Sequence, residues 1–305
     1  MNRERILRTL WRTAISVFLF PLRSTRLLIR ISNLLFRLTD EVDGRVRQLE
    51  ANHTQKIVPP IKRFDGQDEL GKHVLERLPP WKKTATIPSD IPIIMSDEEK
   101  KYYTYIGKFF RGEGAVIELG PWVGGSTFYI LAGLAVNTRF ASQKLQVFDA
   151  FIWQEPWMEA YLPPNSEINL KQGDDFKFLF DRYIEDFKDN VDVYQRKVLA
   201  RYGNDHISDL VWDNGPIEMC FIDVGRDFEI NEAWYKILCS YFIPGKTLLI
   251  MQDWRAFRSV PVMWFNQTKM FTESKGSQLE LIHELRDGGV ATFLYHGDQD
   301  RQKNR

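Results

Sequence analysis

The stretch Ala115-Val-Ile-Glu-Leu-Gly-Pro-Trp-Val-Gly-Gly-Ser-Thr127 decides how the rest of the chain is interpreted. An apolar run of strand character ends near Glu118, turns at Gly120, and reaches Gly124 and Gly125 just before a helix-like segment. Glycines let the backbone turn sharply and approach a ligand, and a helix N-terminus offers free N–H groups. The spacing Gly-x-x-x-Gly-Gly differs from the dinucleotide fingerprint Gly-x-Gly-x-x-Gly. The stretch predicts a ligand-binding loop, with a purely structural tight turn as the alternative.

Strand-like and helix-like segments alternate from Ser96 onward. Ser96 and Glu99 have the Ser-x-x-Glu form of a capping box, which predicts a helix from there to about Phe110. We expect strands at Ala115–Leu119, Leu145–Ala150, Val191–Leu199, Glu218–Val224 and Thr247–Asp253, and helices at Ser126–Ala135, Asp174–Phe187, Asp205–Trp212 and Asn231–Tyr241. This alternation predicts a doubly wound α/β fold, with a mainly parallel sheet covered on both faces.

The end of the chain departs from this alternation. Gln278–Leu285 and Val290–His296 are strand-like runs, and the tight-turn sequence Arg286-Asp287-Gly288-Gly289 joins them. We expect this terminal hairpin to insert an antiparallel strand into the sheet, an ending that separates it from nicotinamide-binding sheets.

Acidic residues end four of the predicted strands. They are Glu118, Asp149, Asp223 and Asp253. Because ligands bind at the carboxyl ends of parallel strands, these acids are candidates for a site at that edge. A carboxylate at the position of Asp149 can accept both hydroxyls of a ribose, although acids also end strands without any function.

The order and spacing of these segments from Ser96 to Gly297 resemble the class I S-adenosylmethionine-dependent methyltransferases, especially the macrocin O-methyltransferase-like and cephalosporin-hydroxylase-like branch. The resemblance covers about two-thirds of the chain. The segments that carry it are Val116-Ile-Glu-Leu-Gly-Pro-Trp-Val-Gly-Gly-Ser-Thr127, Val147-Phe-Asp-Ala-Phe151, Arg201-Tyr-Gly-Asn-Asp205, Cys220-Phe-Ile-Asp223, Pro244-Gly245 and Gln252-Asp253-Trp254. It implies a Rossmann-like, seven-stranded sheet with a C-terminal antiparallel hairpin, and S-adenosyl-L-methionine as cofactor.

The resemblance also implies roles for individual residues. The cofactor's methionyl part would be surrounded by Glu118, Gly120, Gly124 and Ser126, its ribose held by Asp149, and its adenine bordered by Asn204 or Asp205. The candidate catalytic residues are Asp223, Asp253 and Arg226. The two aspartates and His206 are candidate bases, while Arg226 could bind an anionic substrate group or pair with Asp227.

The chain departs from the related sequences at the ends of the fourth and fifth strands. Related sequences often carry further acid or histidine residues after the fourth strand and an Asp-Asp pair after the fifth. This chain has Gly225-Arg226 and Gln252-Asp253 at these places. A divalent metal prefers several carboxylate oxygens, so a divalent metal is doubtful here and we assign no metal-ligating residue.

The N-terminal segment is basic and amphipathic. Residues 1–39 contain eight arginines and one acid. An apolar helical stripe, Leu27, Leu28, Ile31, Leu34, Leu35 and Leu38, is flanked by Arg23, Arg26, Arg30 and Arg37. The longest uncharged run is too short to span a bilayer, so the pattern favours a helix lying at a membrane surface. The stripe could also pack on the catalytic domain or a second subunit, or belong to an organelle-targeting peptide.

We therefore expect a helical extension at 1–53, a linker at 54–95, a methyltransferase-like domain at 96–298 and a polar tail at 299–305. The aromatic insert at 150–190, with Trp153 and Trp157, could be a substrate lid or a covering subdomain with its own core. Zero formal net charge argues against nucleic-acid binding, and two isolated cysteines, Cys220 and Cys239, suit reduced thiols in the cytoplasm.

Three functions fit these observations. The first is methyl transfer to a small molecule or glycan, at oxygen, by a cytoplasmic enzyme with peripheral contact at the inner face of a membrane through residues 1–38. The second is a cofactor-binding protein of the same fold with lost or different catalysis. The third is a membrane-peripheral interaction protein. The sequence leaves oligomerisation and the identity of the acceptor open.

Overall fold

The computed structural model describes residues 79–162, 168–198, 200–202, 205–207, 209–256 and 266–297, with the side chains of 200–202 and 205–207 left out. The predicted N-terminal helices, most of the predicted linker and the polar tail lie outside these residues. No helix within the described part of the chain is both long and apolar enough to cross a membrane.

Nine strands and their connecting helices make up the described fold. The strands are β1 (Ala115–Leu119), β2 (Leu145–Asp149), β3 (Val191–Gln195), β4 (Ala200–Tyr202), β5 (Asp205–Ile207), β6 (Ile217–Ile222), β7 (Leu248–Met251), β8 (Leu279–Glu284) and β9 (Ala291–Tyr295). The α-helices are α4 (Asp97–Gly107), α5 (Gly125–Leu134), α6 (Trp157–Ala160), α7 (Lys177–Tyr183), α8 (Phe228–Leu238) and α10 (Gln267–Ser274). Short 3-10 helices lie at Pro80–Lys83, Thr138–Phe140, Glu185–Asn190, Cys239–Tyr241 and Gly276–Gln278.

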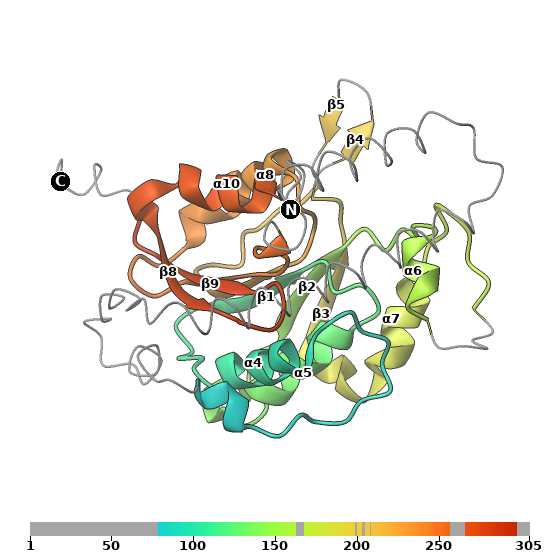
Figure 1. Ribbon diagram of the computed structural model, residues 1–305, viewed down its shortest axis with the longest axis horizontal. Helices are drawn as coiled ribbons and strands as arrows, with labels where there is room; N and C mark the ends of the chain where they lie inside the picture. The colour runs from blue at the N-terminus through green and yellow to red at the C-terminus, as the bar shows by residue number, and fades with distance from the viewer. Residues whose placement is uncertain are drawn as a thin grey trace, which may run out of the picture. The chain divides into compact units, whose positions relative to one another are not determined.

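Seven strands form one sheet in the order β3-β2-β1-β6-β7-β9-β8 (Figure 1). The first five are parallel, whereas β9 pairs antiparallel with both β7 and β8. The C-terminal hairpin therefore inserts its second strand into the sheet, next to the last parallel strand. The predicted fold class, a doubly wound and mainly parallel seven-stranded sheet of the class I methyltransferase type, is confirmed.

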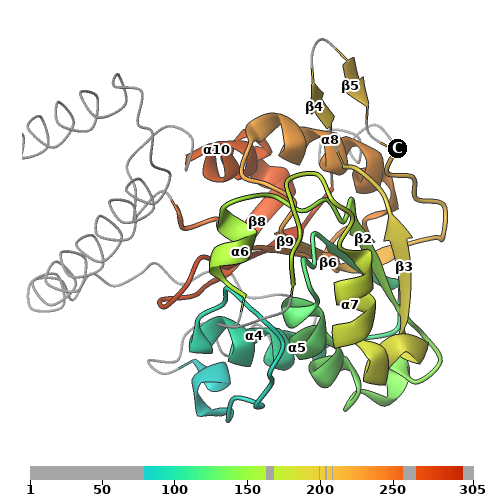
Figure 2. The ribbon, with the colours of Figure 1, turned by 90° about the vertical axis from the view of Figure 1, so that its right-hand side faces the viewer.

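Helices cover the two faces of the sheet. In Figures 1 and 2, α4 and α5 lie on one face and α8 and α10 on the other. Alternate residues of β7 divide between these layers: Leu248 and Ile250 belong to the core beneath α4 and α5, whereas Leu249 and Met251 belong to the core beneath α8 and α10. Both faces are buried at the centre of the sheet, which explains why β1, β6 and β7 are apolar nearly throughout, whereas the outer strand β3 alternates with polar residues.

The capping box predicted from sequence starts α4. Ser96 Oγ accepts a hydrogen bond from the Glu99 N–H at 3.2 Å, and the Ser96 N–H donates to Glu99 Oε2 at 2.7 Å. The Ser96 hydroxyl also donates to the Asp287 carbonyl at 2.7 Å, which ties the helix start to the turn between β8 and β9. Ahead of this point, Trp81 is already buried against the same core.

Several local predictions differ from the structure. The helix expected at Asp205–Trp212 is wrong, because β5 pairs antiparallel with β4 through Arg201↔His206 and its neighbours. Asp, His and Ile are weak helix formers, so backbone pairing decides their conformation. The helix expected at Asp174–Phe187 is shorter, since α7 begins at Lys177 and gives way to a 3-10 helix. The prediction omitted α6 and α10.

Replacing Ser96 with alanine should lower the free energy of unfolding by about 1 kcal/mol, because the first turn of α4 loses its side-chain acceptor. Urea denaturation followed by circular dichroism measures this change. Ser142→Ala is the matched control, because Ser142 is exposed and caps no helix. Equal stability of the S96A and S142A variants would contradict the capping role.

Candidate functional site

The loop between β1 and α5 is held tightly between the ends of two neighbouring strands. Gly120 has φ +82°, and its N–H donates to the Phe148 carbonyl of β2 at 2.8 Å. On its other side, a Cβ at this position would lie 2.3 Å from the Asp223 carbonyl oxygen after β6. Gly124, with φ +95°, is the N-cap of α5. Both positions require glycine, which explains the spacing found in the sequence.

Glu118 is buried at the end of β1, with 2% of its surface exposed. Its Oε1 accepts a hydrogen bond from the Ser126 hydroxyl at 2.6 Å, and its Oε2 accepts one from the Thr127 hydroxyl at 2.7 Å. Burial raises the pKa of Glu118 to about 7 despite these two donors, and the negative charge of Asp149 acts in the same direction. Glu118 is therefore a carboxyl group that a nearby positive charge would favour in its ionised form.

Asp149 ends β2, directly beside the loop. Its Oδ1 accepts a hydrogen bond from the Phe151 N–H at 2.7 Å, and the backbone N–H groups of Trp122 and Ala150 also favour its ionised form. The protein around this partly exposed side chain displaces water and raises the pKa of Asp149 to about 6. Because Trp122 belongs to the loop after Glu118, the glycine bend and the Asp149 carboxylate meet at one edge of the sheet, as predicted.

Strained backbone gathers at this edge. Among the described non-glycine residues, positive φ angles occur at Trp122 (+50°), Phe151 (+52°) and Asp253 (+58°). Each follows a strand of the parallel sheet: β1, β2 and β7. Such conformations cost on the order of 1–3 kcal/mol each and persist where the surrounding structure fixes them, often beside bound ligands. Their position agrees with a ligand site at the carboxyl ends of these strands.

The candidate catalytic residues lie along the same edge. Asp223 follows β6, and its N–H donates to the Leu119 carbonyl of β1 at 2.8 Å. Arg226 pairs with Asp253 after β7: its Nε donates to Asp253 Oδ2 at 2.7 Å, and its Nη2 lies 2.5 Å from the same oxygen. This ion pair joins Arg226 to Asp253, a partner that the two alternatives expected from sequence did not include.

Asp223 is surrounded by negative charge. Loss of surrounding water, and then Asp253, raise its pKa well above the usual range, with smaller contributions from Glu99 and Glu118, while Arg226 opposes the rise. Asp223 keeps a solvent-exposed surface at this edge. The edge of the sheet therefore carries an excess of carboxylates over cations.

Sequence reasoning missed a buried polar cluster beneath these acids. The Tyr103 hydroxyl donates to Gln252 Oε1 at 3.0 Å, and Gln252 Nε2 donates to Glu99 Oε1 at 2.9 Å. Tyr103 is 2% exposed, and burial followed by the charges of Asp223 and Glu99 raises its pKa. The signal was present in the sequence, since Glu99 and Tyr103 are four residues apart and share one face of the predicted helix.

The aromatic insert packs only partly into the core of the domain. Trp153 is 1% exposed and packs edge-on against Phe176, and both rings belong to the main core beneath α4 and α5. Trp157 is 40% exposed, and its ring lies 6.0 Å from that of Trp122 in the glycine loop. The insert therefore has a packed part and an exposed aromatic part beside the candidate site.

Not all predicted site residues belong to the described part of the chain. Asn204 lies outside the described residues, and the side chains of Asp205 and His206 are not described. Within the described residues, no three His, Cys, Asp or Glu side chains are arranged to hold a metal ion. Cys220 is buried and Cys239 partly exposed, both as free thiols.

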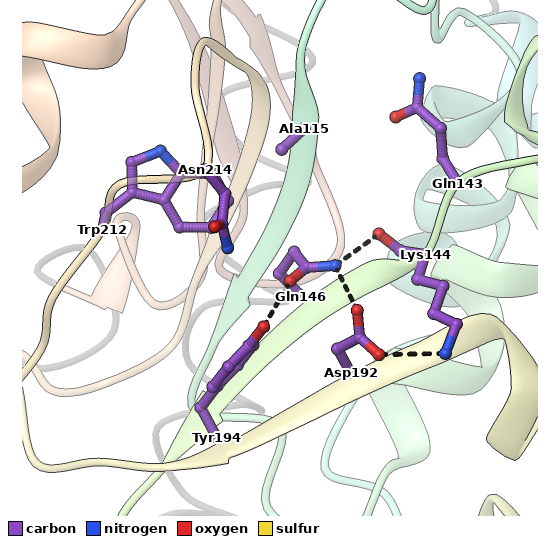
Figure 3. A pocket seen from close by; sticks show the side chains of 8 residues that line it. All are labelled: Ala115, Gln143, Lys144, Gln146, Asp192, Tyr194, Trp212 and Asn214. Atoms are coloured by element: carbon purple, nitrogen blue, oxygen red, sulfur yellow. Dashed lines mark hydrogen bonds and ion pairs between the residues drawn. The ribbon is translucent and has the colours of Figure 1, made fainter.

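A cavity of about 420 Å³ lies at the opposite edge of the sheet (Figure 3). Its lining includes Ala115 at the start of β1, Lys144 just before β2, and Asp192 near the start of β3. Its polar groups largely bind one another: Lys144 Nζ donates to Asp192 Oδ1 at 3.1 Å, and the Tyr194 hydroxyl donates to Gln146 Oε1 at 3.0 Å. This cavity is separate from the candidate site.

No family model and no curated protein sequence matches the chain. Solved structures that resemble it include the S-adenosylhomocysteine-bound methyltransferase PaMTH1 of Podospora anserina (13% identity, 84% of this chain and 95% of that chain, TM-score 0.42). Another is CalS11, a TDP-rhamnose 3'-O-methyltransferase of calicheamicin biosynthesis (12% identity, 65% of this chain and 77% of that chain, TM-score 0.40). A third is the O-methyltransferase NovP (14% identity, 66% of this chain and 78% of that chain, TM-score 0.40). At these low values, the fold assignment depends on the chain's own strand order.

The buried Glu118 should make the chain less stable as the pH rises. Its pKa is about 7 in the folded chain against 4.5 as the reference value, so the folded state holds the proton more tightly. This stabilisation is complete below about pH 4.5 and is lost as the pH passes 7, a loss of about 3 kcal/mol. Glu118→Gln should abolish this loss, which urea denaturation at pH 5 and pH 8 measures.

The exposed Glu155→Gln variant is the matched control and should keep the wild-type dependence on pH. If the free energy of unfolding falls by the same amount in E118Q and E155Q between pH 5 and pH 8, ionisation of Glu118 does not cause the loss. The assigned direction of the Glu118 pKa shift would then be wrong.

Proposed function

We propose that this chain transfers a methyl group from S-adenosyl-L-methionine to an oxygen atom of a small-molecule or glycan acceptor. The observation that carries the proposal is the meeting of Glu118, the glycine bend and Asp149 at the carboxyl edge of a methyltransferase-type sheet. We assign the activity to residues 96–298. The carboxyl ends of parallel strands are the usual ligand-binding edge of such sheets.

The chemistry of the two carboxylates fits the cofactor. S-adenosyl-L-methionine carries an ammonium, a sulfonium and a ribose diol, and when bound it supplies an electrophilic methyl group. Each oxygen of Glu118 takes one hydroxyl donor and keeps a second acceptor position, so Glu118 can receive the ammonium. Asp149 can accept the ribose hydroxyls. Gly120, Gly124 and Ser126 would line the methionyl part, and Asn204 or Asp205 the adenine.

The acceptor would then approach from the side of β6 and β7. Asp223 follows β6, and its backbone carbonyl lies next to Gly120 of the loop. Loss of surrounding water and the neighbouring Asp253 carboxylate raise the pKa of Asp223 well above its usual range, which makes it a stronger base than an ordinary aspartate. We assign Asp223 the role of accepting the proton of the acceptor hydroxyl. His206 is the alternative base, and Asp253 is paired with Arg226.

Alignment of the acceptor oxygen with the transferred methyl is the remaining requirement for this displacement. The exposed ring of Trp157 lies beside Trp122 of the glycine loop, and from there it could cover the acceptor and exclude water. A flat sugar face or an aromatic ring would stack on such side chains. We infer that the 150–190 insert contributes to acceptor binding.

A second candidate function is cofactor binding without methyl transfer. The observation that favours it is the ion pair of Arg226 with Asp253, which engages one of the two acids at the acceptor side. Interaction of the chain with a membrane-bound partner is the third candidate. Cofactor affinity and methyl transfer distinguish these functions, because the second predicts binding alone and the third predicts neither.

Asp149→Ala should weaken S-adenosyl-L-methionine binding by about 5-fold to 150-fold, because the ribose loses a hydrogen-bond acceptor worth about 1–3 kcal/mol. Isothermal titration calorimetry of the full chain measures the affinity, and a labelled methyl group incorporated from the cofactor into a cell extract measures transfer. Asp192→Ala is the control, since Asp192 lies on the neighbouring strand near the opposite edge. Unchanged affinity in D149A would refute the ribose assignment.

We also propose, from the sequence of residues 1–38 alone, that this segment binds anionic membrane surfaces. Each arginine near such a surface contributes roughly 1 kcal/mol. Replacing Arg23, Arg26, Arg30 and Arg37 with glutamine should therefore abolish sedimentation of the full chain with phosphatidylserine-containing vesicles. Vesicles of phosphatidylcholine alone give the control level. If the variant sediments like the wild type, the arginines do not hold the chain at the membrane.

A further inference from the structure

The acceptor side of the edge already contains a cation. Both Nε and Nη2 of Arg226 contact a single oxygen, Asp253 Oδ2, at 2.7 and 2.5 Å. About one-third of the Arg226 side chain and 28% of that of Asp253 remain exposed, so the pair is partly buried. Paired charges that lose part of their water interact more strongly than a pair on the open surface.

The backbone fixes where this pair lies. Asp253 has φ +58°, and the N–H of Ala256 donates to its carbonyl at 3.0 Å. The preceding Gln252 N–H donates to the Ile222 carbonyl of β6 at 2.9 Å, which holds the end of β7 beside the end of β6. Asp253 is thus brought next to Asp223, and the two carboxylates repel each other.

The neighbouring amide is turned away from the pair. Gln252 accepts from the Tyr103 hydroxyl and donates to Glu99, so both ends of its amide are engaged by α4. A glutamate or aspartate at this position would add a third carboxylate beside Asp223 and Asp253. The Gln252 amide is thus engaged by α4, while the Arg226 guanidinium contacts Asp253.

Two repelling carboxylates at neighbouring strand ends need a positive charge, and two kinds of cation could supply it. A Mg²⁺ or Mn²⁺ ion needs carboxylate oxygens directed at it, about 2.0–2.2 Å away. Asp253 Oδ2 is instead engaged by two guanidinium nitrogens. The residues of this chain thus do not fit a divalent ion at this place.

We propose that the Arg226 guanidinium is the resident cation of the acceptor side, where it takes the place of a divalent metal beside Asp253 and Asp223. Calling this place the acceptor side rests on the proposed function, whereas the assignment of the cation does not. A guanidinium keeps its charge at all physiological pH values and has a fixed planar geometry. Arg226 is thus a positioning residue: it holds Asp253 and leaves Asp223 as the group that accepts the proton.

The proposal is tested by titrating the full chain with MnCl₂, following free Mn²⁺ by electron paramagnetic resonance. Wild type should show no saturable binding up to about 1 mM, the weak end of carboxylate sites. Arg226→Gln removes the charge and frees Asp253, so Mn²⁺ should now bind at Asp253 and the neighbouring Asp223, and the double variant R226Q/D253N should lose this binding. Arg182→Gln, which removes an exposed arginine on α7, is the matched control and should behave like wild type.

Saturable Mn²⁺ binding by wild type that Asp253→Asn abolishes would overturn the proposal. So would the absence of Mn²⁺ binding in an R226Q protein whose thermal midpoint and circular dichroism match those of wild type, because the guanidinium would then not be what occupies the ion's place. Binding that appears in R226Q and disappears in R226Q/D253N supports the proposal.

Methyl transfer provides a second, independent measurement. Dialysis against EDTA should leave wild-type transfer unchanged, whereas R226Q should lose it by at least about 10-fold and Arg226→Lys should recover part of it. Loss of transfer on chelation, restored by Mg²⁺, would overturn the proposal. If the chain binds no S-adenosyl-L-methionine, the proposed function fails, while the Mn²⁺ titration still decides whether Arg226 is the resident cation.

Discussion

The position of β1 between β2 and β6 is the constraint on which the site depends. Its pairing with both neighbours brings Glu118, Asp149 and Asp223 to the same edge of the sheet. Gly120 fits this junction because it donates to Phe148 on one side and lies against the Asp223 carbonyl on the other. Any side chain at Gly120 would separate the strands, so fold and site share one steric requirement.

The sequence predicted the fold well where periodicity and local chemistry agree. The buried strands and the capping box at Ser96 were found because apolar runs, a serine and a glutamate at fixed spacing have one favourable arrangement. The inserted strand β9 was also predicted, since Gly288 and Gly289 make a tight turn between two strand-like runs. The helix predicted at Asp205–Trp212 was wrong because pairing with β4 is a contact that helical periodicity cannot reveal.

The site was predicted in part. Acids that end strands were identified, because parallel topology brings those ends together. Tyr103 and Gln252 were not assigned to it, since their bond joins residues 149 positions apart and depends on how α4 packs over the sheet. For Arg226, the sequence suggested a substrate contact or a pair with Asp227. Its ion pair with Asp253 was not predicted, because it depends on the order of β6 and β7 in the sheet.

The raised pKa values of Glu118 and Asp149 show that the site would favour a ligand with a positive charge. Glu118 and Asp149 are held where ionisation is unfavourable, and two nearby backbone positions, Trp122 and Phe151, are strained. A cationic ligand at Glu118 would favour its ionised form and offset the loss of stability at neutral pH, which links binding to stability. At Asp253 that need is already met within the chain by Arg226. Negative charge is therefore balanced in two ways at one edge of the sheet. Glu118 is suited to a cation from a bound ligand, whereas Asp253 is paired with Arg226 of the same chain.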